Sequence, residues 1–275
     1  MSVVLGIDVG VSTTKIVGYN GGKKLIGTLQ VKAADQVTSL YGAVGNFLHL
    51  YSVPLRRVKT VVLTGVGASY VSDRIYEIPT YRVDEFKAIG LGGLKLTDLE
   101  QALVVSMGTG TAFVRATKDE VVHIGGSGVG GGTLMGLSER LFQENDIAAI
   151  AKLARNGNLN NVDLTIRDIT NNNVIGSLPP EMTASNLGRI RHTATAADLA
   201  LGLLNMIFQT VGMLAVFACR NDTIKDVVLT GAMTVFPQAR EIFSFLEKRY
   251  GIRYLIPDNA IFATAIGAAY PYLDE

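Results

Sequence analysis

The chain has 275 residues, which is enough for one large domain or two of medium size. Hydrophobic residues make up 48% and charged residues 18%, which excludes a disordered chain, since such chains lack apolar surface to bury. With 25 basic and 24 acidic residues the net charge is +1, so no overall field attracts nucleic acid. A single cysteine, Cys219, excludes an intrachain disulfide framework and a four-cysteine zinc site.

From the first residues of the sequence we expect no signal peptide. Its N-terminus runs directly into an apolar strand, without the basic region and cleavage site of a signal peptide. The scarcity of cysteine suits a reducing compartment, so we expect a cytoplasmic protein. The longest apolar stretch, residues 199–219, is long enough to span a membrane, but Asn205, Gln209 and Thr210 interrupt it. We therefore expect a helix buried between layers or between subunits, and no membrane partner.

The spacing of apolar residues predicts the order strand, strand, strand, helix, strand in the first 65 residues. The expected ranges are 3–7, 12–19, 24–31, 35–50 and 58–63. The same kind of pattern returns later, with strands expected at 102–106, 111–117, 120–124 and 226–229 and helices at 196–220 and 235–250. In both parts the last strand ends in the tripeptide Leu-Thr-Gly, at 63–65 and at 229–231.

This repeat has a period of roughly a hundred residues or more, which is too long for a solenoid. It indicates an α/β fold of two duplicated domains with a cleft between them; two unrelated α/β segments are the alternative. We place the boundary near residues 92–98, which gives one domain at 1–95 and a second at 96–275. Residues 156–173 are rich in Asn and Gly and are expected to contain an exposed loop.

A turn rich in hydroxyl groups follows the first strand, where residues 8–15 have the sequence DVGVSTTK. A tight turn there presents backbone N–H groups, and its hydroxyls together with Lys15 add donors, a combination that holds an anion such as phosphate. Asp8, at the end of the strand, can position Mg²⁺ through water. An ordinary hairpin with solvated hydroxyls is the alternative.

A matching turn, MGTGT at 107–111, lies in the second half, and the duplication predicts that the two turns face each other across the cleft. A third cluster, residues 125–132, holds six glycines in eight positions and precedes a helix expected to start near Thr133. Glycines let the backbone approach a ligand closely, and a helix N-terminus favours anions. A flexible linker is the alternative. Neither a Walker sequence nor a GxGxxG motif opening a Rossmann unit is present.

Together these motifs resemble the phosphate-1, phosphate-2 and adenosine motifs of the sugar kinase, Hsp70 and actin superfamily. That resemblance implies duplicated ribonuclease H-like (actin-like ATPase) domains with ATP in the cleft. More narrowly, the chain is similar over nearly its whole length to the type II pantothenate kinases. The matching segments are 8–15, 83–86, 107–111, 124–132, 182–188, 229–232 and 259–267.

The resemblance implies a homodimeric kinase that uses ATP and Mg²⁺ to phosphorylate the primary hydroxyl of pantothenate, the first step of coenzyme A biosynthesis. It implies that Asp8 lies near the metal and that Glu85 is the general base for the substrate hydroxyl, with Asp84 as the fallback. The residues that it places around ATP are Asp8, Gly10, Ser12, Thr13, Thr14, Lys15, Thr109, Gly110, Gly131, Gly132, Thr133, Gly231 and Ala232.

Three positions depart from the usual family pattern. Val11 stands where a second glycine is usual, His123 where an arginine is usual, and Ala112 where a serine is usual. The last two fall in the expected acceptor pocket, where His123 is either a substrate contact or a plain strand histidine. Histidine is often uncharged near neutral pH, whereas arginine is a permanent cation. We therefore expect weaker binding of pantothenate, or a less anionic acceptor such as pantetheine.

Other classes of protein share parts of this pattern. The sequence of residues 8–15 also resembles the ATPase activators of radical dehydratases, which hold an iron–sulfur cluster with two cysteines per chain. Cys219 alone cannot supply them. A nucleotide-binding sensor with weak turnover and a kinase for another small alcohol or sugar are the remaining alternatives.

Overall fold

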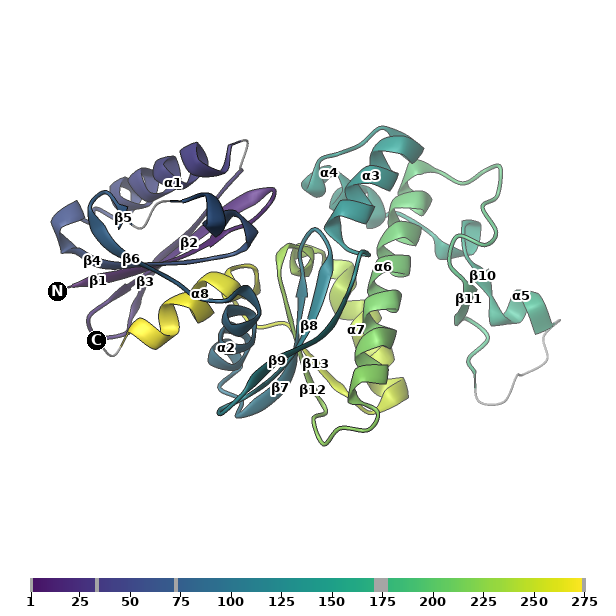
Figure 1. Cartoon of the computed structure of the whole chain (residues 1–275). Helices are drawn as coiled ribbons and strands as arrows, with labels where there is room; N and C mark the ends of the chain where they lie inside the picture. Colours follow the sequence, from purple (N-terminus) through teal and green to yellow (C-terminus); the bar gives the residue numbers. More distant parts are fainter. Residues whose placement is uncertain (1, 33–34, 72–73, 171–177, 274–275) are drawn as a thin grey trace.

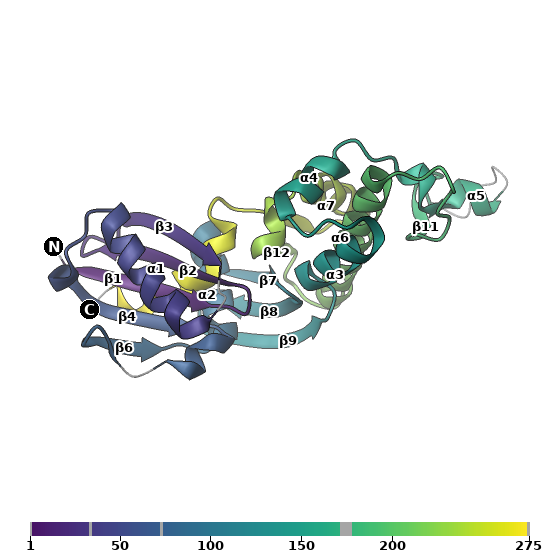
Figure 2. The same ribbon diagram turned by 90° about the horizontal axis from the view of Figure 1, so that it is seen from above.

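A computed structural model describes residues 2–32, 35–71, 74–170 and 178–273. Two β-sheets form the two halves of the molecule, and helices α2 (Glu85–Thr97) and α8 (Ala263–Ala269) lie between them (Figure 1). Further helices cover the outer face of each sheet, as the view from above shows (Figure 2).

The first sheet has the strand order β3-β2-β1-β4-β6-β5. Helix α1 (Gln36–Leu50) packs on one face, because the side chains of Leu40, Val44 and Phe47 recur on one side of the helix and are buried. Asp35 caps this helix by accepting a hydrogen bond from the Thr38 N–H at 2.7 Å. The strands are β1 (Val3–Val9), β2 (Thr13–Asn20), β3 (Leu25–Lys32), β4 (Val58–Thr64), β5 (Arg74–Ile75) and β6 (Ile78–Arg82).

The second sheet has the order β13-β12-β7-β8-β9, which repeats the core of the first. In each half the first two strands are antiparallel, and the first strand is parallel to the strand that ends in Leu-Thr-Gly. The predicted duplication is therefore confirmed. The strands are β7 (Gln101–Met107), β8 (Thr111–Thr117), β9 (Val121–Ser127), β12 (Asp226–Thr230) and β13 (Arg253–Leu255). Helices α6 (Ala196–Cys219) and α7 (Pro237–Tyr250) lie on its outer face, and α3 (Gly131–Phe142) and α4 (Ile147–Ala154) pack against α6.

The two Leu-Thr-Gly tripeptides adopt the same backbone conformation. Gly65 has φ +88° and Gly231 has φ +89°, a region that disfavours any side chain. A Cβ at Gly65 would lie 2.6 Å from Asp8 Oδ1, and one at Gly231 would lie 2.5 Å from the Met107 carbonyl oxygen. A short 3₁₀ helix follows each glycine, at Val66–Tyr70 and at Ala232–Val235. The repeat thus extends to single residues.

Helices α2 and α8 are exchanged between the halves. Helix α2 follows the first sheet in sequence but packs on β7, β8 and β9, whereas α8 packs on β1 and β4. The two helices touch closely, because a Cβ at Gly92 would lie 1.9 Å from the Ala263 carbonyl oxygen and one at Gly267 would lie 1.9 Å from that of Ala88. The predicted division after residue 95 falls inside α2, so it does not separate these packing units.

Helix α6 is the long apolar helix that the sequence predicts. By length and composition it could cross a membrane, and 56% of its most apolar 18-residue window is buried inside the protein. Its inner side packs against α3, α4 and α7, while Leu214 and Phe217 remain exposed. Much of its apolar surface is therefore used within the chain, in agreement with the expected buried helix.

The expectation of an exposed loop at 156–173 is only partly correct. The segment contains a 3₁₀ turn (Leu159–Asn161), β10 (Leu164–Thr165) and α5 (Ile166–Thr170), and β10 pairs with β11 (Thr183–Ser185). The fully buried Asp163 organises it by accepting hydrogen bonds from the Thr183 hydroxyl, the Asn205 amide and the Leu187 N–H at 2.8–3.0 Å. Residues 171–173 lie outside the described residues.

Candidate active site

Three polar side chains stand in one row across the first sheet. Asp8 on β1 pairs with Lys15 on β2 and with Thr64 on β4, so the three side chains project from the same face. Helix α8 packs on this face, because a Cβ at Gly6, two residues before Asp8, would lie 2.2 Å from the Ala265 carbonyl oxygen. The row therefore lies on the side of the sheet that faces the second half.

Asp8 and Lys15 form an ion pair within this row. Lys15 Nζ lies 3.2 Å from Asp8 Oδ2, and the two side chains are only 11% and 10% exposed. The attraction between the two charges offsets part of the free energy lost when both are removed from water. Charged side chains that are this deeply buried are usually paired in this way. The site therefore contains a fixed ammonium group at the phosphate turn.

The predicted tight turn lies between β1 and β2, at residues 10–12. The Gly10 N–H donates to the Thr13 carbonyl at 3.0 Å and closes the turn. The side chain of Val11 is 59% exposed, so it points to solvent and leaves the inside of the turn open. Thr14 lies differently from its neighbour Lys15. It pairs with Val9 on the opposite face of the sheet and is fully buried, so the structure does not bring its hydroxyl to the row.

Glu85 is the first residue of α2, and its charge interacts with those of Asp8 and Lys15 in the row. The adjacent Asp84 is the N-cap of this helix and accepts a hydrogen bond from the Lys87 N–H at 2.9 Å, which leaves Glu85 as the carboxyl that is free to react. Burial raises the pKa of Glu85, the charges of Asp8 and Asp84 raise it further, and Lys15 lowers it. Glu85 is thus within electrostatic reach of the Asp8–Lys15 pair, as a general base beside phosphates should be.

His123 and Ala112 lie beside the start of α2. Ala112 and Val114 on β8 share one face of the sheet, and Val114 pairs with His123 on β9. The imidazole of His123 stacks on the ring of Phe86, with centroids 3.8 Å apart and planes 8° apart. The structure therefore brings both predicted acceptor residues close to Glu85. From the sequence alone, no role was assigned to Phe86. Its position directly after the expected base could have indicated an aromatic contact in the acceptor pocket.

The second glycine turn and the third cluster form one unit. The Gly131 N–H donates to the Gly108 carbonyl and the Gly132 N–H to the Thr109 carbonyl, both at 2.8 Å. The Thr133 hydroxyl accepts from the Gly130 N–H and donates to the Gly128 carbonyl. The backbone N–H groups of Gly131 and Gly132 at the start of α3 therefore bind the turn at 107–111 and are not free to donate to a ligand. If a phosphate binds here, these glycines would contribute by letting it approach the backbone closely.

The expected adenosine segment adjoins this unit. The Gly231 N–H donates to the Ala260 carbonyl at 3.1 Å, which fixes the turn that leads into Ala232. A Cβ at Gly131 would lie 3.5 Å from the Met233 sulfur, so this segment lies against the start of α3. The structure thus gathers the second-half residues expected around ATP, including Gly110 of the turn between β7 and β8, at one end of the second sheet.

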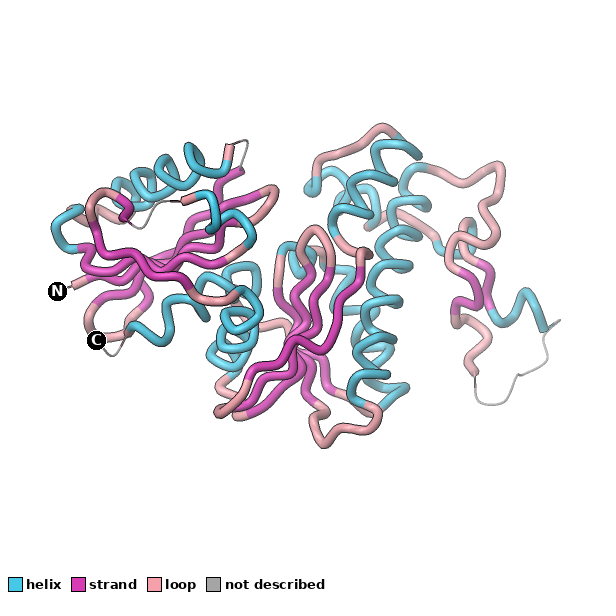
Figure 3. Tube along the Cα trace, in the orientation of Figure 1, coloured by secondary structure: helices cyan, strands magenta, loops and turns pink. Residues whose placement is uncertain are grey.

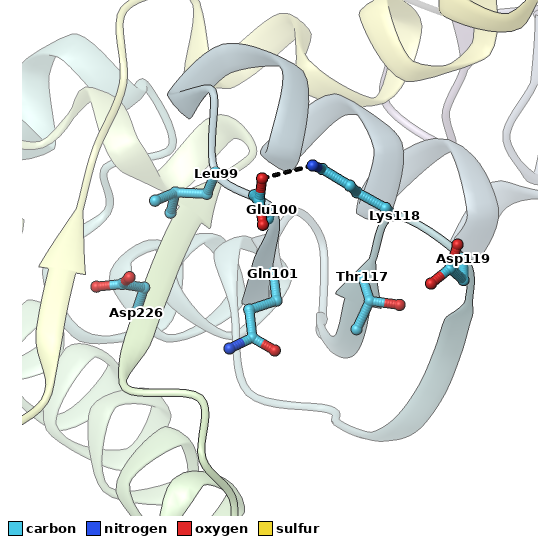
Figure 4. A pocket seen from close by; sticks show the side chains of 7 residues that line it. All are labelled: Leu99, Glu100, Gln101, Thr117, Lys118, Asp119 and Asp226. Carbon is cyan, nitrogen blue, oxygen red and sulfur yellow. Dashed lines mark hydrogen bonds and ion pairs between the residues drawn. The ribbon is translucent and has the colours of Figure 1, made fainter.

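A surface cavity of about 390 Å³ lies at the other end of that sheet (Figure 4). It is found where β7 begins and β8 ends, away from the glycine turns, and Lys118 across it is paired with Glu100. It therefore takes no part in the site described above. Its lining residues are Leu99, Glu100, Gln101, Thr117, Lys118, Asp119 and Asp226.

The donor set at Asp8 suits a hydrated cation. Within the described ranges, no group of three or more His, Cys, Asp and Glu side chains is arranged to hold a metal directly. Mg²⁺ commonly uses one or two carboxylates plus substrate phosphates and keeps several waters. Asp8 offers one carboxylate, and the buried Thr64 hydroxyl beside it has no hydrogen-bond partner among the described residues. These residues therefore fit a cation held mainly through water.

Comparisons with known proteins identify relatives along nearly the whole chain. A family model described as Fumble matches residues 95–245. The type II pantothenate kinase of Staphylococcus epidermidis is 26% identical over 276 residues, covering 97% of this chain and 99% of that protein. The enzyme of the same name from Staphylococcus aureus is 25% identical over 279 residues, covering 97% and 98%.

Solved structures share the fold. The activator of the 2-hydroxyisocaproyl-CoA dehydratase from Clostridium difficile, with bound ADPNP, has a TM-score of 0.70 at 14% identity and covers 99% of this chain and 94% of its own. The ROK hexokinase from Thermus thermophilus has a TM-score of 0.59 at 16% identity and covers 99% of both chains. The predicted actin-like ATPase fold is thereby confirmed.

Proposed function

The chain belongs to the Fumble family, and we propose that it is an ATP-dependent kinase that phosphorylates the primary hydroxyl of pantothenate, the first step of coenzyme A biosynthesis. Similarity to the staphylococcal type II pantothenate kinases along nearly the whole chain supports this proposal. The observation that carries it is the position of Glu85, a carboxyl of raised pKa within electrostatic reach of the Asp8–Lys15 pair at the phosphate turn.

Phosphoryl transfer depends on positioning and on neutralising charge more than on covalent help. The Lys15 ammonium and the turn between β1 and β2 would hold the phosphates of ATP. Glu85 would take the proton of the acceptor hydroxyl as its oxygen bonds to the γ-phosphorus and the bond to the ADP oxygen breaks. Its raised pKa makes it a stronger base, which suits proton removal from an alcohol. Mg²⁺, when bound near Asp8, would neutralise phosphate charge.

A second copy of the chain completes the proposal. Helices α3 and α6 pack together, and both expose apolar side chains: Leu137 and Leu141 on α3, Leu214 and Phe217 on α6. Phe217 is 58% exposed, although a large aromatic side chain is stabilised by burial. A homodimer joined through these helices would cover them, and we propose this state for a cytoplasmic enzyme with neither nucleic-acid nor membrane partners.

A neutral relative of pantothenate, such as pantetheine, is the second candidate acceptor. The observation that favours it is His123 itself, stacked on Phe86 beside the start of α2, because a histidine, unlike an arginine, is not a permanent cation for a carboxylate. Ala112, on the same face of the sheet, adds no hydroxyl donor. Both features make the acceptor pocket less suited to an anion.

The role of a radical-dehydratase activator is not supported, although the fold is shared. The single cysteine, Cys219, is buried in α6, and burial raises the pKa of its thiol to about 11. Cluster iron binds thiolates, and two cysteines per chain would be needed. A nucleotide-binding sensor with weak turnover remains the alternative that the next experiment addresses.

The test is ATP consumption in the presence of pantothenate, pantetheine or pantoate, with mass spectrometry of the product. The proposal expects pantothenate to gain one phosphoryl group at a rate that Glu85→Gln lowers by about 10²–10⁴-fold. Exclusive use of pantetheine would select the second acceptor. ATP binding without phosphorylation of any of these compounds would identify a sensor and contradict the kinase.

A further inference from the structure

The two halves place a threonine at equivalent points, but only one of the two hydroxyls has a partner. Thr64 ends β4 and Thr230 ends β12, each directly before a glycine of positive φ. Thr230 Oγ1 donates to the Val105 carbonyl oxygen at 3.5 Å. Thr64 Oγ1 is buried and makes no hydrogen bond to any described residue. Because a buried hydroxyl without a partner is unfavourable, this atom points to something bound there.

Thr64 lies between Asp8 and the segment that leads to Glu85. On one side it pairs with Asp8 of β1. On the other side the carbonyl of the preceding Leu63 accepts a hydrogen bond from the Val83 N–H at 2.9 Å, two residues before Glu85. The side chain is 1% exposed, which excludes any partner for its hydroxyl that is larger than a water molecule.

We infer that Thr64 is a positioning residue whose hydroxyl shares a water molecule with Asp8, and that this water belongs to the hydration shell of the divalent cation accompanying the nucleotide. The inference rests on the proposed function. Asp8 Oδ2 is already paired with Lys15, and the other oxygen, Oδ1, lies against Gly65, the residue that follows Thr64.

A water bound to a cation is a donor through both hydrogens, and it therefore needs two acceptors. The Asp8 carboxylate supplies one and the Thr64 hydroxyl oxygen supplies the other. Groups that hold the outer shell in this way tune the affinity of a site for its metal. In the second half, Ser106 takes the position of Asp8, so the residue paired with Thr230 carries no carboxylate, which agrees with the structural hydrogen bond of that threonine to the Val105 carbonyl.

The experiment compares Thr64→Val with the matched control Thr230→Val. Valine keeps the shape and removes the hydroxyl. We expect Thr64→Val to retain or raise the melting temperature of the free protein, since it removes an unpaired buried hydroxyl, and to weaken Mn²⁺ binding to the protein–ADP complex by roughly three- to tenfold, measured by EPR. Thr230→Val should lower the melting temperature and leave Mn²⁺ affinity unchanged. Thr64→Ser, which keeps a hydroxyl, should restore that affinity.

Each outcome bears on the inference. Equal Mn²⁺ affinity in Thr64→Val and the unmodified protein overturns it, and leaves the kinase proposal intact if pantothenate is still phosphorylated. Equal weakening in Thr64→Val and Thr230→Val also overturns it, because the effect would then be a general one on the sheet. Absence of any Mn²⁺–ADP binding by the unmodified protein would contradict both this inference and the proposed function.

Discussion

The raised pKa of Glu85 gives the proposed kinase a definite pH dependence. Burial is its largest cause, followed by the charges of Asp8 and then Asp84, with Lys15 acting in the opposite direction. A general base must be deprotonated to work, so kcat/KM should fall as the pH decreases through this raised pKa. Glu85→Gln should lower kcat by about 10²–10⁴-fold, a barrier increase of about 2.7–5.4 kcal/mol, with ATP affinity little changed.

Asp84→Asn provides the matched control. Asparagine is as good an N-cap as aspartate, so α2 should keep its capping bond to the Lys87 N–H. The change removes one of the negative charges that raise the pKa of Glu85. The acidic limb of the kcat/KM profile should therefore move to lower pH while the rate on its plateau is retained. Steady-state kinetics across acidic to neutral pH, with direct detection of ADP, measures both effects.

The same shift predicts a change in stability. Because the pKa of Glu85 is higher in the folded than in the unfolded chain, its stabilising contribution is present below the unfolded value and is lost as the pH rises through the folded one. Glutamine is neutral throughout, so Glu85→Gln should melt at a higher temperature than the unmodified protein near neutral pH, and this difference should disappear in acid. Full activity in Glu85→Gln, or a large loss only in Asp84→Asn, would refute the assignment of the base.

Three further predictions concern the rest of the site and the subunit contact. Asp8→Asn should fold but lose most turnover and the thermal stabilisation by ATP·Mg²⁺, because it removes the carboxylate paired with Lys15; full activity would exclude a role in metal binding. His123→Arg combined with Ala112→Ser should lower the KM for pantothenate by roughly tenfold to a hundredfold, the worth of a charge-assisted hydrogen bond, and an unchanged KM would mean that other groups already bind the carboxylate. Light scattering should show a dimer that Phe217→Asp converts to a monomer, whereas an unmodified monomer at micromolar concentration would remove the proposed interface.

The repeated strands could be predicted from the sequence because they are signalled locally. Buried strands are short apolar runs, and the repeated Leu-Thr-Gly tripeptide needs a glycine at the same point of each half, since φ is positive there. The sequence also predicts Glu85 as the base and the turn at 8–15 as a phosphate site, and both stay predictions; the role of the base comes from the resemblance to a family. Thr14 was assigned to ATP despite the alternation of side chains along a strand, which already places it on the face opposite Lys15.

The parts that could not be predicted depend on contacts between distant segments. No local sequence pattern predicts that α2 packs on the second sheet or that α8 packs on the first. Gly92 and Gly267 allow the two helices to touch, but this role is apparent only from the folded structure. The stacking of Phe86 on His123 joins residues far apart in the chain. The amides of Gly131 and Gly132 looked free for an anion, and only the folded turn shows which carbonyls accept from them.

The duplicated halves differ in the charge of the side chains that they place at equivalent positions. Each sheet presents a row of three paired positions, and in the first half these hold Thr64, Asp8 and Lys15. In the second half the same positions hold Thr230, Ser106 and Ala112, none of them charged. Both rows stand on equivalent scaffolds, so the difference lies in side chains alone.

A charged row next to Glu85 can neutralise phosphates and hold a cation, whereas the uncharged row can contribute only backbone turns and small side chains. Under the proposed function, the first half would supply the groups that act on the transferred phosphoryl group, and the acceptor would be selected by the residues where the second sheet meets the start of α2. Those residues are the Phe86–His123 stack and Ala112. It follows that changes at His123 should alter which alcohol is phosphorylated, and changes at Asp8 or Thr64 should alter how the nucleotide and its cation are held.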